Sequence, residues 1–326
     1  MIGTWMVRIT GRTVVWLATL GVLAAWGIRL TIRDSRPEYA VLFYATPPSL
    51  IFGGTVIAAF GWSVRGKRIA AGLSYFVMAC SFILWIGSSY QMTIPFSQPH
   101  DGLKVVYWNT ARGAFGWHGV FWELQKQRPD VIAVCEAGMS KEDLDDWQAA
   151  FPQYQATDMD GQLLLLSKIP IGQLGYCDLR TGKYKRIRLD TNTGPVQLVL
   201  VDVDSNTSIN RDTLFESIVD ELTCWQNDPM LIVGDFNTPR DSVHFHHFER
   251  RFRNAFETSG KGYAPTWPMP FPVLQIDHAW HNNRLAVTEC HQEWTRFSDH
   301  RPMILHVRPE VPVSTIKNDN ALDGVL

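Results

Sequence analysis

Three long apolar segments without charged residues, all within the first 95 positions, constrain the fold of this chain more than any other feature. Residues 13–30 carry no charge before Arg29, and residues 40–64 and 69–90 carry none at all. Each segment has about the 20 residues that a helix needs to cross the hydrocarbon core of a bilayer, and soluble folds rarely contain such runs. The predicted transmembrane helices are residues 13–31, 40–63 and 69–90.

Two features bear on this membrane region. Arg8 and Arg12 would also suit the basic end of a cleaved signal peptide. However, two further apolar segments follow, and the first segment has no convincing small-residue cleavage site. Pro47 and Pro48 interrupt the second segment, so we predict a kink or break in that helix.

The distribution of basic residues predicts the orientation by a narrow margin. With the N-terminus in the cytoplasm, five basic residues lie on the inner side and four on the outer side. The inner residues are Arg8, Arg12, Arg65, Lys67 and Arg68, and the outer ones are Arg29, Arg33, Arg36 and Lys104. By the positive-inside rule, three spans then place the rest of the chain on the non-cytoplasmic side.

The chain beyond position 100 has the composition of an acidic soluble domain. The first 100 residues hold 8 of the 30 basic and 2 of the 32 acidic residues, which leaves a net charge of −8 for the rest. Such a charge disfavours a broad nucleic-acid-binding surface. The predicted organisation is a membrane region at residues 1–94, a linker at 95–101, a soluble domain at 102–308 and a flexible tail at 309–326.

Short apolar strands alternate with amphipathic helices through this soluble domain. Helical spacing and capping residues predict helices at residues 117–127, 141–150 and 211–225, the second of them capped by Ser140. The segment at residues 259–272 is rich in Gly and Pro and is predicted to be a loop. The predicted strands are residues 103–108, 131–135, 163–166, 171–176, 184–189, 196–203, 231–233, 275–280, 286–290 and 303–307.

The segment at residues 231–239 shows how polar residues follow these strands. Three aliphatic residues form a short buried strand, Gly234 permits a tight exit, and Asp235 and Asn237 follow two residues apart. Side chains at i and i+2 of an extended segment point to the same side, so a carboxylate and an amide are presented together. The alternative interpretation is a local Asx-turn, which Asp and Asn also favour.

Carboxylate, amide and imidazole groups follow several other strands in the same way. Oxygen ligands such as those of Glu136, Asn109 and Asp299 suit a hard divalent cation. An imidazole beside a carboxylate, as at His300, is oriented for proton transfer or electrostatic stabilisation. This set of groups matches the requirements of metal-assisted phosphoryl transfer. Its members are Asn109, Glu136, Asp235, Asn237, Asp277, Asp299 and His300.

Five segments, in this order, resemble the successive motifs of the endonuclease/exonuclease/phosphatase superfamily. They are residues 103–109, 129–136, 234–237, 276–278 and 298–302. The resemblance implies a four-layered α/β sandwich, with two packed and mainly antiparallel sheets flanked by helices and the site at one end. It also implies a metal-dependent phosphoric ester hydrolase that uses Mg²⁺, or Mn²⁺, so that residues 102–308 would be the catalytic domain.

The resemblance further implies a role for each residue. Asp235 would position or deprotonate the attacking water, and Asn237 would hydrogen-bond the phosphate in the transition state. His300, held by Asp277, would stabilise the phosphate or exchange protons with it. The implied metal ligands are Glu136, Asn109 and Asp299, the catalytic residues are Asp235, Asn237, His300 and Asp277, and the substrate-binding residues are Arg112, Trp267 and Arg211.

One position departs from the family pattern. Many relatives have a His-Leu pair at the end of the strand that precedes the helix at residues 211–225, and Asp204 stands where that His would fall. An anion there repels phosphate unless a metal or Arg211 compensates, so the departure concerns the substrate class. Nucleic acid, a lipid headgroup and a small metabolite all stay open as substrates, with the bilayer as a second partner. No protein partner can be inferred.

Weaker signals have competing interpretations. The basic segment at residues 183–188 would bind phosphates of nucleic acid or lipid, or would be a solvated edge strand. His244, His246 and His247 are not spaced to bring three imidazoles to one helix face, so we predict surface histidines rather than a zinc site. The five cysteines lack metal-site spacing, and we predict no pairing.

A different class of function is a non-catalytic, membrane-tethered binding module of the same fold. Such a module would be expected to have lost residue types such as Glu136, Asp235, Asn237 or His300. All four types are present. The leading prediction is therefore a membrane-anchored, Mg²⁺-dependent phosphoesterase.

Overall fold

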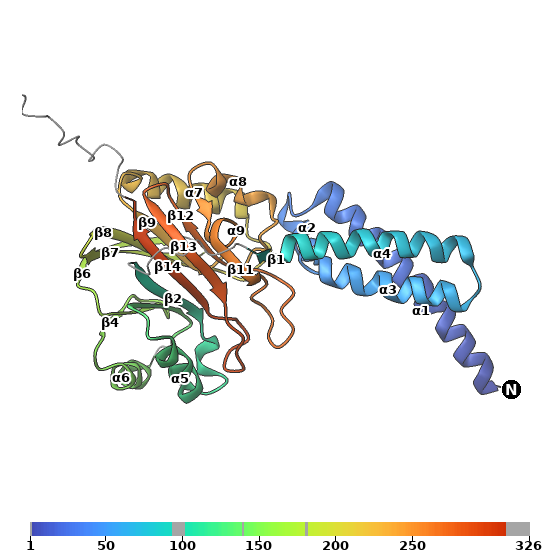
Figure 1. The fold of residues 1–326 in the computed structure, drawn as a ribbon, viewed down its shortest axis with the longest axis horizontal. Helices are drawn as coiled ribbons and strands as arrows, with labels where there is room; N and C mark the ends of the chain where they lie inside the picture. Colours follow the sequence, from blue (N-terminus) through green and yellow to red (C-terminus); the bar gives the residue numbers. More distant parts are fainter. Residues whose placement is uncertain (1, 93–101, 139, 180–181, 311–326) are drawn as a thin grey trace, which may run out of the picture.

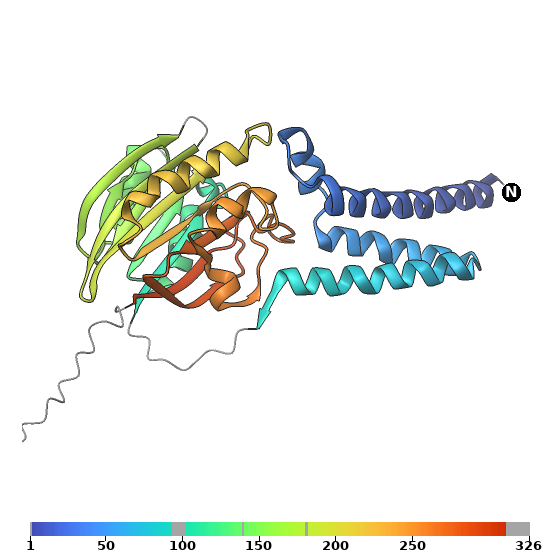
Figure 2. The ribbon, with the colours of Figure 1, turned by 90° about the horizontal axis from the view of Figure 1, so that it is seen from above.

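A bundle of helices projects from one side of an α/β domain (Figures 1 and 2). This computed structural model describes residues 2–92, 102–138, 140–179 and 182–310. The predicted linker at residues 95–101 lies outside the described residues, as does the predicted tail beyond residue 310.

The helical region contains two or three segments that are long and apolar enough to cross a membrane. Residues 11–32 and helix α4 pass this test singly, whereas α2 and α3 pass it only as a pair bent by 55°. The bend lies at Pro47 and Pro48, as the sequence predicts, because proline lacks the N–H that would continue the helix. The helices are α1 (Ile2–Gly27) with the π-helical turn η1 (Ile28–Ile32), α2 (Pro37–Tyr44), α3 (Pro48–Val64) and α4 (Arg68–Ser89).

The helices pack closely through small residues and keep large apolar side chains on the outside. A β-carbon at Gly61 of α3 would lie 2.0 Å from a methyl carbon of Val15, so only glycine allows this approach of α1 and α3. Leu17, Phe60 and Ile69 are more than half exposed. An exposed apolar surface of this extent is typical of contact with lipid or protein.

The first sheet of the α/β domain has eight strands. Two of its strand pairs, β11 with β13 and β2 with β3, are parallel, and the other pairs are antiparallel. In order, the strands are β1 (Tyr90–Met92), β11 (Gly260–Tyr263), β13 (Leu285–Gln292), β14 (Met303–Pro309), β2 (Leu103–Asn109), β3 (Val131–Cys135), β5 (Leu164–Ser167) and β4 (Gln155–Asp158).

The second sheet has six strands, and only β8 and β9 pair in parallel. In order, they are β10 (Arg253–Asn254), β12 (Asp277–His281), β9 (Met230–Asp235), β8 (Gly194–Val203), β7 (Gly182–Thr191) and β6 (Ile171–Leu179). The predicted pair of mainly antiparallel sheets is thus confirmed.

Three apolar clusters separate four layers. The central cluster lies between the sheets and includes Tyr107 and Leu200. A second packs α7 (Arg211–Leu222) and α8 (His246–Glu249) on the six-stranded sheet, with Phe215 at its centre. A third packs α5 (Trp117–Gln127) and α6 (Lys141–Ala150) on the eight-stranded sheet around Trp147. The four-layered α/β sandwich is therefore confirmed.

Short strands at or next to the sheet edges are the part of the fold that the sequence did not predict. Strands β1, β4, β10 and β11 each have two to four residues, and β11 falls in the segment predicted as a loop. Strand β1 follows α4 directly and pairs with β11, so the last helix of the bundle runs into the edge of the eight-stranded sheet. The short helix α9 (Ala255–Ser259) lies between β10 and β11.

Candidate active site

Three carboxylates stand side by side across the end of the six-stranded sheet. Asp277, Asp235 and Asp202 are register partners on the adjacent strands β12, β9 and β8. Directly paired residues point to the same face of a sheet. Asp235 continues the alternation of Leu231 and Val233, which belong to the cluster between the sheets, so this row faces the opposite sheet.

The turn after β9 explains the Gly-Asp-Phe-Asn sequence. A β-carbon at Gly234 would lie 2.1 Å from the Val201 carbonyl oxygen, so glycine is required where β9 passes β8. Asn237 has a φ of 46°, a left-handed conformation that asparagine tolerates. Its backbone N–H donates to Asp235 Oδ1 at 2.8 Å and its Nδ2 donates to the Val203 carbonyl oxygen at 2.8 Å. The Asx-turn and the paired presentation of the two side chains therefore coexist.

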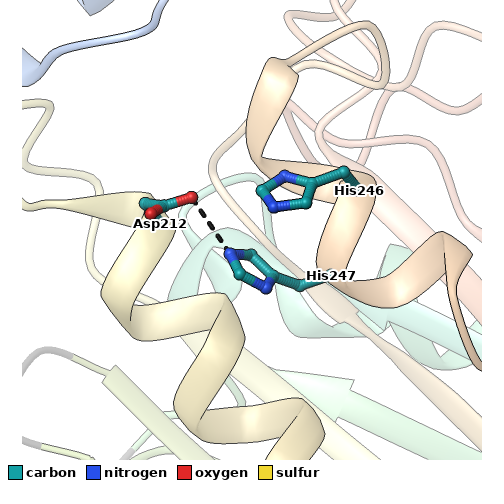
Figure 3. Close-up of side chains that lie close together, drawn as sticks. All are labelled: Asp212, His246 and His247. Carbon is teal, nitrogen blue, oxygen red and sulfur yellow. Dashed lines mark hydrogen bonds and ion pairs between the residues drawn. The ribbon is translucent and has the colours of Figure 1, made fainter.

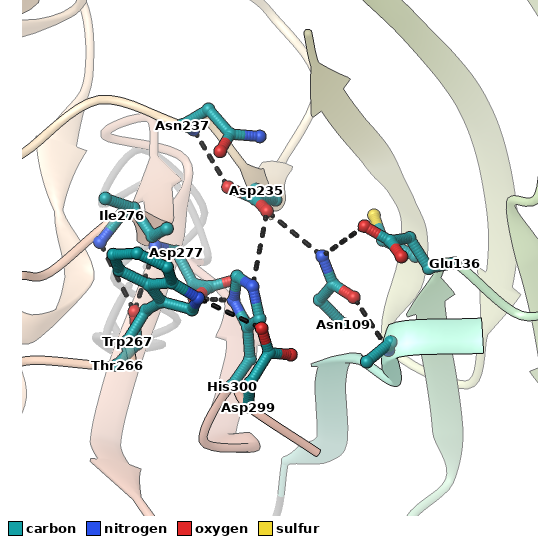
Figure 4. Close-up of polar contacts among 12 residues, drawn as sticks. Asn109, Glu136, Asp235, Asn237, Thr266, Trp267, Ile276, Asp277, Asp299 and His300 are labelled. Atoms are coloured by element: carbon teal, nitrogen blue, oxygen red, sulfur yellow. Dashed lines mark hydrogen bonds and ion pairs between the residues drawn. The ribbon is translucent and has the colours of Figure 1, made fainter. Parts of the chain in front are cut away.

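His300 and Asp277 form a buried pair next to Asp235. His300 Nδ1 lies 2.8 Å from Asp277 Oδ2, and Tyr107 donates its hydroxyl to Asp277 Oδ1 at 3.0 Å. His300 Nε2 lies 3.9 Å from Asp235 Oδ2 (Figure 4). Asp277 thus orients the imidazole, whose second nitrogen is directed toward Asp235.

Asn109 connects Asp235 to Glu136. Its Nδ2 donates to Asp235 Oδ2 at 3.0 Å and to Glu136 Oε1 at 3.3 Å, while its Oδ1 accepts from the Ala111 backbone N–H at 3.0 Å. Glu136 has a φ of 54°, which is uncommon for a non-glycine residue and turns the chain at the end of β3. Two sheets therefore contribute carboxylates to one site, with an amide between them (Figure 4).

Burial and the clustering of charge perturb the acid–base properties of this site. Burial, followed by the charge of Asp277, raises the pKa of Asp235 to about 8. Burial, with a smaller contribution from Glu136, raises the pKa of Asp202 to about 6. Although burial opposes it, the interaction with Asp277 raises the pKa of His300 to about 10. His300 in turn outweighs burial and keeps the pKa of Asp277 below its ordinary value.

These groups fit a divalent cation. Glu136, Asp202 and Asp235 line one cavity, where the charge of Glu136 contributes to the raised pKa of Asp202, and a cation bound among these carboxylates would relieve their repulsion. Asp235, Asp277 and His300 also each bring one ligand atom to within 4.8 Å of the others. Glu136 and Asp235 line the cavity whereas Asp277 lies behind His300, so Glu136 and Asp235 are the better donors.

The predicted third metal ligand lies elsewhere. Asp299 Oδ2 accepts a hydrogen bond from Trp267 Nε1 at 3.1 Å, beside His300. In Figure 4, Glu136 lies on the other side of Asn109 from Asp299. Asp299 therefore holds the indole that lines the cavity, and it lies off the cavity itself.

The cavity has a volume of about 1210 Å³, and two of the three predicted substrate-binding residues line it. Trp267 and Arg112 lie on the wall, and Arg112 Nε is 3.4 Å from Glu136 Oε2. Arg211 is buried, and its Nη2 donates to the Asp204 backbone oxygen at 2.5 Å. Arg211 thus lies behind the cavity wall. It is next to Asp204, whose negative charge it was expected to compensate.

The structure adds Asp202, which the sequence analysis did not single out, and places the basic segment beside it. Asp202 lies on the cavity wall, with Lys183 Nζ 3.8 Å from its Oδ2. Lys185, which is 3% exposed, lines the same wall. The interpretation of this basic segment as an edge strand is wrong, because β7 lies between β6 and β8. Alternation along β7 was the available signal, since it places Lys183 and Lys185 on one face.

The histidine-rich segment is not a surface feature, which corrects a prediction. His244 and His247 are buried, because this segment packs against the N-terminal end of α7. His247 Nε2 lies 3.0 Å from Asp212 Oδ1, and His244 Nδ1 lies 3.5 Å from the same atom. Asp212, His246 and His247 form a second group whose geometry could hold a metal ion (Figure 3). The buried cysteines Cys135 and Cys290 are free, in accord with the prediction for the described residues.

His278, directly after Asp277, leads to a prediction about stability. Its Nε2 contacts the Thr238 carbonyl oxygen at 2.9 Å, and full burial lowers its pKa to about 3. Below about pH 6.5 the unfolded chain binds a proton that folded His278 binds only near pH 3. The free energy of unfolding is therefore expected to fall by up to about 1.4 kcal/mol per pH unit as the pH decreases from 6 to 4.

Thermal unfolding of the detergent-solubilised protein between pH 7.5 and 4 measures this effect. The control is His278→Leu, which loses the hydrogen bond and is expected to be less stable at pH 7.5. Its stability should nevertheless change less with pH than that of the wild type. Parallel pH profiles for the two proteins would show that His278 does not contribute.

Comparisons with known proteins agree with this architecture. The profile of the Endonuclease/Exonuclease/phosphatase family matches residues 123–300. A functionally unknown conserved protein from Enterococcus faecalis V583 is 15% identical, with a TM-score of 0.53 over 64% of this chain and 100% of that one. An endonuclease/exonuclease/phosphatase from Bacteroides vulgatus is 13% identical, with a TM-score of 0.51 over 64% and 99%.

A further solved structure, D. rerio TDP2 complexed with a single-strand DNA product, is 12% identical, with a TM-score of 0.53 over 64% of this chain and 99% of that one. No curated protein matches the chain. The structural likenesses support the fold, and the profile covers more than half of the sequence. The chain therefore belongs to the endonuclease/exonuclease/phosphatase family of phosphoester hydrolases.

Proposed function

We propose that this protein is a membrane-anchored, Mg²⁺-dependent phosphoesterase that hydrolyses a phosphodiester or phosphomonoester by direct attack of water. The observation that carries the proposal is the position of Asp235. It lies between the His300–Asp277 pair and the Asn109–Glu136 pair, within a single cavity. A base, an oriented imidazole and an oxygen-rich cation site thus converge on one small volume.

Asp235 is the general base in this proposal. Its pKa, raised to about 8, makes the Asp235 carboxylate a stronger base than an ordinary aspartate once it is deprotonated. As the water oxygen bonds to phosphorus, one of its protons passes to Asp235. The bond between phosphorus and the ester oxygen then breaks, and the departing alkoxide takes a proton from solvent. Asp235 releases its proton to solvent, so that one water is consumed per turnover.

His300 and Asn237 stabilise the negative charge that develops on the phosphate. The raised pKa of His300 keeps its imidazole protonated at neutral pH, so Nε2 can donate to a phosphate oxygen. Asn237 presents its amide at the cavity wall. Donors that are already fixed in place stabilise a transition state without reorganising, which makes their contribution large.

Glu136 and Asn109 are the residues proposed to hold the metal, with Asp235 beside them. A bound Mg²⁺ would supply Lewis-acid stabilisation of the phosphate charge. Asn109 Oδ1 accepts one hydrogen bond, from the Ala111 N–H, and its second lone pair would be the one available to the metal. Asp299 is proposed to act on this site only through Trp267, to which it is hydrogen-bonded.

Membrane anchoring is supported by the helical region. Its outward-facing side chains are largely apolar, and two or three of its segments are long enough to span a bilayer. We propose a multi-pass membrane protein whose catalytic domain lies on the non-cytoplasmic side. Protease treatment of intact cells tests the orientation, since a cytoplasmic catalytic domain would be protected.

Hydrolysis of bis-p-nitrophenyl phosphate by the full-length protein in detergent tests the function. With Mg²⁺ we expect turnover, and with EDTA a rate at least about tenfold lower that added Mg²⁺ restores. Turnover that is insensitive to EDTA would contradict the metal dependence.

Glu136→Gln tests the metal ligand directly. Loss of the carboxylate charge is expected to raise the Mg²⁺ concentration for half-maximal activity by about 10- to 100-fold. Glu142→Gln, on the exposed first turn of α6, is the matched control and should leave the Mg²⁺ requirement unchanged. An equal Mg²⁺ requirement in wild type and Glu136→Gln would remove Glu136 from the metal site.

A further inference from the structure

Helix α2 of the helical region forms part of the catalytic cavity. Val41, Tyr44 and Ala45 line the same cavity as Asp235 and His300. Tyr44 also interacts with Thr238, just beyond the turn that carries Asn237. Figure 2 shows the segment that contains α2 between the long helices and the α/β domain. The site is therefore built from both parts of the chain.

Buried polar contacts hold α2 in this position. Asp34, which is 1% exposed, precedes the helix, and its Oδ1 accepts from the Val243 backbone N–H at 3.0 Å. The Asp34 carbonyl oxygen lies 2.7 Å from His244 Nε2. Arg29 forms an ion pair with Asp241 in the same segment. A buried and hydrogen-bonded carboxylate at the junction specifies a single arrangement of the two parts.

A second attachment lies at the end of α4. The Ala264 backbone N–H donates to the Ser89 carbonyl oxygen at 2.8 Å, and β1 pairs with β11. The loop that follows β11 carries Trp267, which lines the cavity. The helices thus contact the catalytic domain through two separate segments: α2, which lines the cavity itself, and the end of α4 with β1, whose partner β11 leads to Trp267.

The rim of the cavity continues into apolar surface. Val41 on α2 and Leu50 at the start of α3 are each 56% exposed. Phe271, in the loop with Trp267, is 81% exposed. If the long helices cross a bilayer, their ends at α2 lie at its surface, and the cavity opens there. Arg36, the residue directly before α2, is also exposed and would attract anionic headgroups.

The charges of the cavity do not resemble a nucleic-acid-binding groove. Such grooves are strongly basic because they track the phosphate backbone. Here the lining contains more acidic than basic side chains. The acidic residues are Glu136, Asp160, Asp202, Asp204 and Asp235, and the basic ones are Arg112, Lys183, Lys185 and His300.

We propose, building on the phosphoesterase function above, that the substrate is a membrane lipid with a phosphate ester in its headgroup. The lipid enters from the bilayer surface along α2, so that its phosphate reaches Asp235 and His300 while its apolar part stays at the membrane. Water adds to phosphorus, the bond from phosphorus to one of its ester oxygens breaks, and that alcohol leaves with a proton. The phosphate stays on the other product.

Two neighbouring residues of α2 provide a matched test. Val41 lines the cavity, whereas Leu42 is equally apolar and exposed but faces away from it. Full-length Val41→Glu and Leu42→Glu are reconstituted in phosphatidylcholine–phosphatidylglycerol vesicles. Hydrolysis of the vesicle lipids and of soluble bis-p-nitrophenyl phosphate is then measured with Mg²⁺. Size-exclusion profiles in detergent confirm that both variants are folded.

We expect lipid hydrolysis by the wild type, and a ratio of lipid to soluble-substrate kcat/KM that falls by about tenfold in Val41→Glu and is unchanged in Leu42→Glu. Equal ratios in the two variants would overturn the inference. So would a wild type that hydrolyses the soluble diester or plasmid DNA but no vesicle lipid. Failure on every substrate would instead contradict the phosphoesterase function itself.

Discussion

His300→Asn is expected to lower kcat/KM for bis-p-nitrophenyl phosphate by about 10³-fold, because it removes a cationic donor that faces Asp235. In the folded protein the imidazole is buried. Its Nδ1 is hydrogen-bonded to Asp277 Oδ2 at 2.8 Å, and its Nε2 lies 3.9 Å from Asp235 Oδ2. Asparagine keeps a hydrogen-bonding side chain of similar reach but cannot carry a positive charge. The loss should appear in kcat, because the developing charge exists only in the transition state.

Asp277→Asn separates orientation from charge. This variant keeps the imidazole but removes the carboxylate that raises its pKa. With a lower pKa, His300 loses its proton as the pH rises, so the activity of Asp277→Asn should decline at a lower pH than that of the wild type. A pH–rate profile with the wild-type alkaline limb, or a His300→Asn variant within tenfold of wild type, would contradict the assigned role.

Local patterns predicted those parts of the fold that local interactions determine. Helix α6 begins where the sequence indicated because Ser140 and Asp143 form a reciprocal capping box. The strand ends that carry Glu136 and Asp235 were recognisable because a buried apolar run stops at a polar residue. Such signals depend on a few neighbouring positions, so one sequence is sufficient to read them.

Distant partners determine what the sequence did not predict. Strand β1 has three residues, and its pairing with β11 joins Tyr90 to Tyr263, so neither segment shows a pattern of its own. Asp34 contacts Val243, 209 positions away, and nothing near either residue indicates the contact. The wall that α2 adds to the cavity follows from this junction and was therefore inaccessible to sequence reasoning.

The candidate site shows the same division. The sequence indicated Asn109, Asp235 and His300 as strand-end residues, and the structure brings them within hydrogen-bonding or near hydrogen-bonding distance. Asn109 and Asp235 do end strands, whereas His300 lies in the turn before β14. Asp202 escaped notice because it precedes the residue that departs from the family pattern, Asp204. Only the pairing of β8 with β9 sets Asp202 beside Asp235. Sequence thus identifies the chemistry of single strand ends, whereas register decides which of them are neighbours.

Asp235→Asn, compared with Asp202→Asn, tests which of these two paired carboxylates is the base. Both line the cavity and both have a raised pKa, about 8 for Asp235 and about 6 for Asp202. Only Asp235 contacts Asn109 and faces His300. We expect Asp235→Asn to lower kcat by about 10³-fold, because an amide cannot accept the proton of the attacking water.

Asp202→Asn is expected to stay within about tenfold of wild type, since its carboxylate contributes to the charge of the cavity without contacting the other catalytic residues. Both substitutions are nearly isosteric, so each variant should fold, and thermal unfolding in detergent provides the check. A kcat loss in Asp202→Asn as large as that in Asp235→Asn would mean that the base is shared across the β8–β9 pair. An active Asp235→Asn would transfer the role to Asp202, because it is the next carboxylate along the same row and faces the same cavity.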